Sequence, residues 1–217
     1  MLKYVYNFNN LKDMFTAFVN KIIKTLVVGD ILFFSAFGLV SPIFAIFITN
    51  QIAGATIATV GFAATVNLLV RALLQMPIAR YIDKKKGEKD DFFFMIFGST
   101  LISIVPFLYI FIETPIQLYL AQVVLGIGGA VANPGWYAIF TRHIDKNKEG
   151  TEWTLENVGV GLAAAAAAAL GGVLAKNFGF QNLFLIMGII ALVGVIVQIT
   201  LYSTVIELDH NKDKSHL

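Results

Sequence analysis

Two ionisable side chains, Asp30 and Arg71, lie inside long apolar stretches of the sequence. A charge in the hydrocarbon of a membrane costs about 2.5 to 3.5 kcal/mol on insertion scales, so each needs a partner or a function. At about 1.5 Å per helical residue, we expect both at roughly 8 to 13 Å from one edge of the membrane, on neighbouring helices. The sequence therefore predicts either a static ion pair or a protonatable Asp30 that releases Arg71 during a conformational change.

Further polar side chains accompany Arg71 and recur in a later apolar stretch. Asn67, Arg71 and Gln75 follow one another at four-residue spacing, which places them on one face of a helix. A stripe of this kind is costly against lipid, so we expect it to face other helices, a partner subunit or a water-filled path. Gln122 and Asn133 lie similarly among glycines, and close helix packing explains those glycines at least as well as a cavity does.

The composition is that of a membrane protein. Hydrophobic residues make up 57% of the 217 residues and charged residues 14%, against about 25% charged in soluble domains. There is no cysteine, and the three histidines are scattered through polar segments, so we expect no metal, no cofactor and no enzymatic site. Nothing in the pattern of charge suggests nucleic-acid binding, and the expected surroundings are membrane lipid.

Six apolar stretches are each near the about 20 residues that a membrane-spanning helix needs. They cover residues 25–48, 57–79, 92–112, 116–140, 155–175 and 183–205. Because lipid offers no hydrogen-bond partner to the backbone, these stretches predict an all-α membrane protein with six transmembrane helices. We expect three segments: an amphipathic interfacial segment over 1–21, the six-helix domain over 22–206 and a polar cytoplasmic tail over 207–217.

The distribution of Lys and Arg predicts the orientation of these helices. Four precede the first helix, five lie in the 80–91 loop, three in the 141–154 loop and two in the tail, whereas the other side carries Lys176. By the positive-inside rule both termini and both charged loops are cytoplasmic, in a multi-pass protein of the cell (inner or plasma) membrane.

A weak internal repeat relates the two halves of the sequence. GLVSPIF, at 38–44, and GAVANPGW, at 129–136, each place a proline after small residues in the second half of an outward-going helix. Two units of three helices follow, and an odd number of helices inverts the second unit relative to the first.

The loop after the second apolar stretch resembles a known family signature. Its pattern places Ala79 and Arg80 before Asp83, Lys84 and Gly87, and it is similar to the cytoplasmic loop between helices 2 and 3 of major facilitator superfamily (MFS) transporters. The region from IGGAVANPGW to EGTEW also resembles the helix 4 to helix 5 region of bacterial members. A complete member has twelve helices in two halves, and this chain supplies the six of one half.

The resemblance implies a central cavity lined by helices 1 and 4, which nominates Phe37, Ser41, Asn133 and Tyr137 as lining residues. It also implies that Asp83 latches the cytoplasmic side by meeting the start of a helix in the opposite half. In a second copy that start carries Glu152 and Glu156, although acidic residues at the positive end of a helix dipole need no such explanation.

We therefore expect a half-size transporter that moves an unknown small molecule by alternating access. It would act as a homodimer or with a homologous half, and Asp30 would be a candidate for proton coupling. The apolar and aromatic lining favours amphiphilic solutes over highly charged ones. The alternative is a membrane scaffold, or a relic half-transporter that needs another partner.

Overall fold

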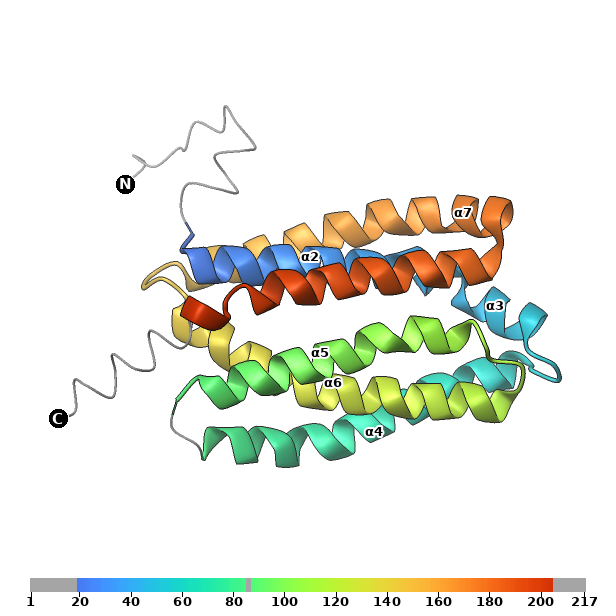
Figure 1. The fold of residues 1–217 in the computed structure, drawn as a ribbon, viewed down its shortest axis with the longest axis horizontal. Helices are drawn as coiled ribbons and strands as arrows, with labels where there is room; N and C mark the ends of the chain where they lie inside the picture. Colours follow the sequence, from blue (N-terminus) through green and yellow to red (C-terminus); the bar gives the residue numbers. More distant parts are fainter. Residues whose placement is uncertain (1–18, 85–86, 205–217) are drawn as a thin grey trace.

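The computed structural model describes residues 19–84 and 87–204, and all regular structure within these ranges is helical (Figure 1). The elements are α2 (Lys21–Val40), η1 (Ser41–Ile43), α3 (Phe44–Gln51), α4 (Ile57–Asp83), α5 (Lys89–Tyr109), α6 (Pro115–His143) and α7 (Glu149–Ile199). In this part of the chain, five helical segments are long and apolar enough to cross a membrane, with α2 to α3 counted as one. The predicted all-helical class is confirmed there. Most of the predicted interfacial segment and the whole predicted tail lie outside the described residues.

The helix boundaries follow from local chemistry. The Asn20 side chain caps α2 by accepting a hydrogen bond from the Ile23 backbone N–H at 3.0 Å. Pro42 lacks an N–H, so the helix tightens into η1 before it continues as α3. Pro115 starts α6, where its missing N–H leaves no bond unmade. The α4 helix continues past Ala79, where the apolar stretch ends, to Asp83.

The long helix α7 reverses direction at Gly179. This residue has a φ of 79°, a left-handed conformation that favours glycine, and the helix is bent there into two arms. The first arm (residues 149–178) and the second arm (residues 180–199) run back along one another in Figure 1. They correspond to the predicted stretches 155–175 and 183–205, and the expected connection between them is reduced to a single non-helical residue.

The bundle consists of two groups of three helical segments (Figure 1). In one group α2 packs against both arms of α7, and in the other α6 packs against α4 and α5. Glycine allows backbones to touch in each group: a Cβ on Gly171 would lie 1.7 Å from the Leu39 carbonyl oxygen, and one on Gly135 would lie 2.2 Å from that of Asp91. The α5 helix and the second arm join the groups, with the Phe107 ring against Gly188.

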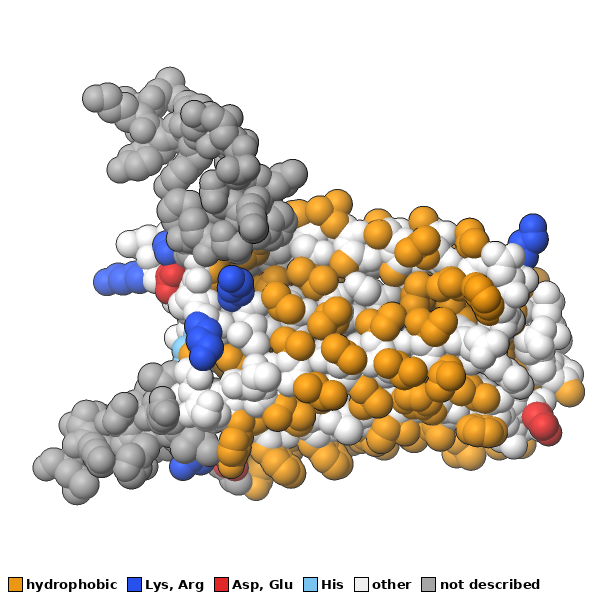
Figure 2. Space-filling model, turned by 45° about the horizontal axis from the view of Figure 1, so that its top comes forward, with side chains coloured by type: hydrophobic (Ala, Val, Ile, Leu, Met, Phe, Trp, Pro, Cys, Tyr) orange, Lys and Arg blue, Asp and Glu red, His pale blue; other side chains and the backbone are white. Residues whose placement is uncertain are grey.

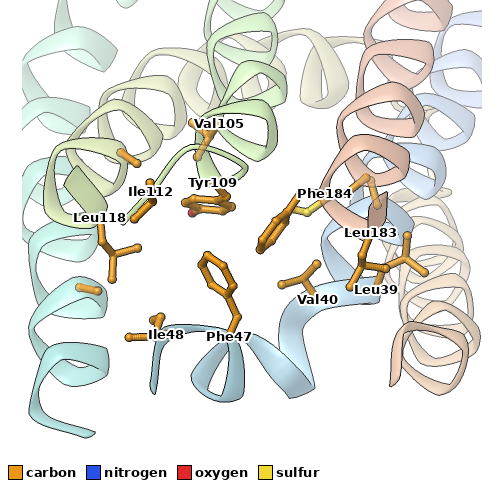
Figure 3. Packing of buried hydrophobic residues seen from close by; sticks show 14 of the residues in the cluster. Leu39, Val40, Phe47, Ile48, Val105, Tyr109, Ile112, Leu118, Leu183 and Phe184 are labelled. Carbon is orange, nitrogen blue, oxygen red and sulfur yellow. The ribbon is translucent and has the colours of Figure 1, made fainter. Parts of the chain in front are cut away.

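Two apolar clusters fill the interior at successive positions along the bundle. The larger is built on aromatic packing, in which the Phe47 ring lies 4.6 Å from that of Phe184, edge to face (Figure 3). The smaller lies toward the end where the described chain begins, around Met95 and Phe140. In sequence, Asp30 and Gln198 fall between the residues of the two clusters. The hydrophobic core is therefore divided by buried polar side chains.

The face shown in Figure 2 is apolar along the length of the bundle, and charged side chains gather at its two ends. Large exposed side chains include Leu69, Leu73 and Met76 on α4, which are 56%, 71% and 60% exposed. A surface of this composition is suited to lipid or to another apolar protein surface.

Candidate functional site

Asp30 is buried between α2 and the second arm of α7. Its side chain is held by Gln198, whose Nε2 donates to Oδ1 at 2.9 Å, and the two residues are 6% and 2% exposed. The Glu156 carboxylate and the Trp136 indole also interact with the Asp30 carboxyl group. The contact with Trp136 falls short of a hydrogen bond, because its buried Nε1 has no bonding partner within the described ranges. Asp30 is thus a buried acid whose hydrogen-bonding partner is a neutral amide.

Arg71 lies on the other side of the bundle, between α4 and α6. Its stem crosses Gly129, where an added Cβ would meet the Arg71 Cδ at 3.3 Å. With the Asn133 amide oxygen turned toward the guanidinium, that oxygen accepts from Nε at 3.3 Å and from Nη2 at 2.5 Å. Gln75 accepts from Nε at 3.4 Å, one helical turn further along α4. Arg71 is therefore also held by neutral amides.

The structure does not bring Asp30 and Arg71 together, so the predicted ion pair is not formed. Their helices belong to different groups, and each side chain bonds to a residue of its own group. Their positions along their helices differ as well. Asp30 lies nine residues into α2, about 14 Å, whereas Arg71 lies 14 residues after the start of α4 and 12 before its end, about 18 to 21 Å from either. The depth of roughly 8 to 13 Å from the membrane edge stays a prediction, because helix ends do not mark the edges of a membrane.

The predicted stripe on α4 does face α6. Asn67 donates from Nδ2 to the Gln122 carbonyl oxygen at 3.4 Å, and Arg71 follows it one turn later. The Gln122 side chain turns away from the stripe and donates to the Tyr109 hydroxyl at 2.8 Å, buried against α5. Gln122 is therefore a packing residue in this structure, whereas the half-buried side chains of Asn133 and Arg71 lie together between α4 and α6.

The other predicted lining residues surround a different space. Phe37 and Ser41 line an open groove of about 460 Å³ between α2 and the first arm, together with Phe34 and alanines of α7. Tyr137 is 45% exposed on α6, one turn after Asn133. Two separate features result: a groove with an apolar lining, and a polar site around Arg71.

The signature loop is only partly described, because residues 85–86 lie outside the described ranges. Arg80, Asp83 and Lys84 are exposed, Ala79 is half-buried, and Gly87 has a φ of 116°, which favours glycine. Of the two acidic residues at the start of α7, Glu152 is fully buried and accepts from the Asp145 N–H at 3.2 Å, and Glu156 is half-buried.

A polar network at this charged end was missed by the sequence reasoning. Asp91, at the start of α5, forms an ion pair with Arg142, at the end of α6. His143 Nε2 lies 3.4 Å from the Glu88 carboxylate. The sequence could have indicated this network. Helices joined by a short connection run antiparallel, so the start of α5 lies beside the end of α6.

The same network ties α2 to α6. Asn20 donates from Nδ2 to the His143 carbonyl oxygen at 2.6 Å and to Asp145 Oδ1 at 3.1 Å. Lys148 approaches the same carboxylate, with Nζ 2.9 Å from Oδ2. The hydrogen bonds from Lys148 and Asn20 hold the pKa of Asp145 below its usual value.

Comparison with known proteins identifies relatives of the whole bundle. The family model of the Major Facilitator Superfamily matches residues 26–216. An uncharacterised MFS-type transporter of Methanocaldococcus jannaschii is 24% identical over 180 residues, which are 83% of this chain and 44% of that protein. The uncharacterised MFS-type transporter YitZ of Bacillus subtilis is 26% identical over 151 residues, which are 70% of this chain and 88% of YitZ. The chain thus spans less than half of the archaeal relative and matches most of the bacterial one.

Proposed function

Because the chain belongs to the major facilitator superfamily, a superfamily of membrane transporters, we propose that it moves a small solute across a membrane by alternating access. The observation that carries this proposal is the pair of charged side chains, Asp30 and Arg71, bonded to amides inside membrane-spanning helices. A bundle needed only for packing has no use for charges that cost insertion energy. Ionisable residues at this depth are typical of solute and proton pathways.

The proposed topology has six spans, with each arm of α7 crossing once and both termini in the cytoplasm. The contacts between helices support the proposed inverted repeat. If the first three segments are exchanged with the last three, the contacts of α2 with the two arms become the contacts of α6 with α4 and α5. The contact between α5 and the second arm stays the same. Single cysteines labelled from outside intact cells test the orientation: a cysteine at Lys176 should react and one at Lys148 should not. The opposite pattern would reverse the orientation.

We propose that a second copy, or a homologous half, supplies the opposite wall of the solute path. The lengths of the relatives support this, since 151 residues of this chain match 88% of the length of YitZ. Native mass spectrometry of the protein in lipid nanodiscs measures the number of copies directly. Cysteines at Asp83 and Leu155 then test the latch contact, because the chain has no native cysteine to compete. A dimer linked from 83 to 155 supports the two-walled transporter, whereas a persistent monomer overturns the homodimer.

Asp30 is the proposed proton-coupling residue. Its burial, its contact with a single donating amide and the nearby Glu156 carboxylate support a side chain that exchanges a proton when the bundle opens. In proteoliposomes with an imposed pH gradient, Asp30→Asn should abolish gradient-driven accumulation and retain downhill exchange of the solute. Proton-driven accumulation by Asp30→Asn at the wild-type rate would remove this assignment.

A further inference from the structure

The Arg71 guanidinium has hydrogen-bonding capacity that the protein leaves unused. A guanidinium carries five N–H donors. Asn133 and Gln75 accept from Nε and Nη2, and Nη1 has no partner among the described residues. No carboxylate within the described ranges forms an ion pair with Arg71, although Asp91 and Asp145 both have cationic neighbours at the charged end. Arg71, in the middle of α4, therefore has no anionic partner among the described residues.

The surroundings hold the guanidinium in place. Gly129 makes room for its stem, and the Asn133 oxygen occupies the edge formed by Nε and Nη2. This fixes the plane of the group, in a side chain that is only half-buried, and leaves Nη1 without a partner among the described residues. A fixed fork of donors matches the two oxygens of a carboxylate or of a phosphate.

The position of Arg71 along α4 bears on the source of such an anion. The residue lies about 18 to 21 Å from either end of the helix, and eight residues, about 12 Å, before the apolar stretch ends at Ala79. We take the partner to be an anion that enters from solution, and the experiment below distinguishes it from a lipid headgroup. The exposed Tyr137 ring, one turn from Asn133 on the same face of α6, offers an apolar and aromatic surface to the rest of such a molecule.

We propose that Arg71 binds the anionic group of the solute, and that the solute is an organic monoanion with one carboxylate or phosphate and an apolar or aromatic body. This rests on the proposed transport function and adds the substrate class to it. Asn133 and Gln75 are positioning residues that hold the guanidinium. An amphiphilic anion suits both the Tyr137 ring and the single charge of Arg71.

Equilibrium binding tests this site separately from transport. The full chain in nanodiscs of phosphatidylcholine is titrated with benzoate, with phenyl phosphate and with the uncharged analogue benzamide, and the shift in thermal unfolding gives the affinity. The two anions should stabilise the wild type saturably, and benzamide should not. Arg71→Gln should weaken anion binding by about tenfold or more, and Arg71→Lys, which keeps the charge and loses the fork, by less. Lys176→Gln removes an exposed cation at the far end of the bundle and should leave the affinity unchanged.

A second variant keeps the test decisive if Arg71→Gln folds poorly. Asn133→Asp places a carboxylate against the guanidinium, so it should raise the unfolding temperature and weaken benzoate binding by about tenfold or more. Equal benzoate binding by wild type, Arg71→Gln and Asn133→Asp would overturn the proposal. Loss of benzoate binding when phosphatidylglycerol is added to the nanodisc would also overturn it, because a lipid headgroup would then be the ligand.

Uptake by proteoliposomes separates the two proposals. Saturable benzoate binding without flux of either anion would remove the transport function and leave the anion site in place. Flux of uncharged solutes that is unaffected by Arg71→Gln, without anion binding, would remove the anion site and leave transport in place.

Discussion

The contact of α2 with α7 and the contact of α6 with α4 are built alike, but the first holds a buried acid and the second holds a base. In each, a central helix lies close to a neighbour at glycine, and one ionisable side chain bonds to an amide. Asp30 is sealed, at 6% exposure, whereas Arg71 is half-exposed. A glycine lies beside each site: an added Cβ on Gly29 would meet the Gln198 Cγ at 2.6 Å, and one on Gly129 would meet the Arg71 Cδ at 3.3 Å. The acid is thus enclosed, whereas the base stays partly exposed.

The largest expected effect is on stability, from a substitution in the contact of α2 with α7. Gly171→Ala would place a methyl group 1.7 Å from the Leu39 carbonyl oxygen, so the helices must separate. We expect a loss of about 3 kcal/mol in the free energy of unfolding, measured by denaturant titration in detergent. Gly172→Ala is the matched control, since a Cβ there meets nothing within 4 Å. Equal stability of the two variants would show that the helices adjust without cost.

The next effect concerns the amide that holds Asp30. Gln198→Leu removes the donor to a buried carboxylate and should cost about 2 kcal/mol, read from the same titration. Adding Asp30→Asn should recover part of this loss, because a neutral side chain tolerates burial better than a charge. A double-mutant cycle gives the coupling between the two residues. Additive losses would mean that the hydrogen bond contributes nothing to stability.

A smaller effect is expected at the buried amide of the α6 group. Tyr109→Phe removes the hydroxyl that accepts from Gln122 and should cost about 1 kcal/mol, the net contribution of one hydrogen bond between neutral groups. Thermal unfolding of Tyr109→Phe beside Tyr202→Phe, an exposed tyrosine, isolates the hydrogen bond. A larger loss at Tyr109 than at Gln198 would reverse the comparison of the two groups.

The smallest effect lies at the charged end, where Asn20, Asp145 and Lys148 join the two groups. The pKa of Asp145 is lowered by Lys148 and Asn20, so its ionised form stabilises the folded state at pH values above its ordinary 3.8. That contribution is lost as the pH falls through the lowered, folded-state pKa. Asp145→Asn should therefore be slightly less stable than wild type at neutral pH, and the difference should vanish in strong acid. A difference that persisted there would point to packing.

Helix positions could be predicted from the sequence because each span is an apolar run near the length of a bilayer core. The stripe of Asn67, Arg71 and Gln75 was predictable too, since it depends on spacing along one helix. The partner of Asp30 was not predictable. Gln198 lies 168 residues away, and only the choice of neighbouring helices brings the two together. For the same reason, spacing could not show which of two neighbouring helices the Gln122 side chain would meet.

The bend at Gly179 bears on how this protein is made. The two arms of α7 are separated by one non-helical residue, so with the proposed topology we expect them to enter the bilayer together as a hairpin. Between Asn157 and Thr204, Lys176 is the only formal charge in that hairpin. Its insertion would also bring Gln198 to Asp30 on the first helix.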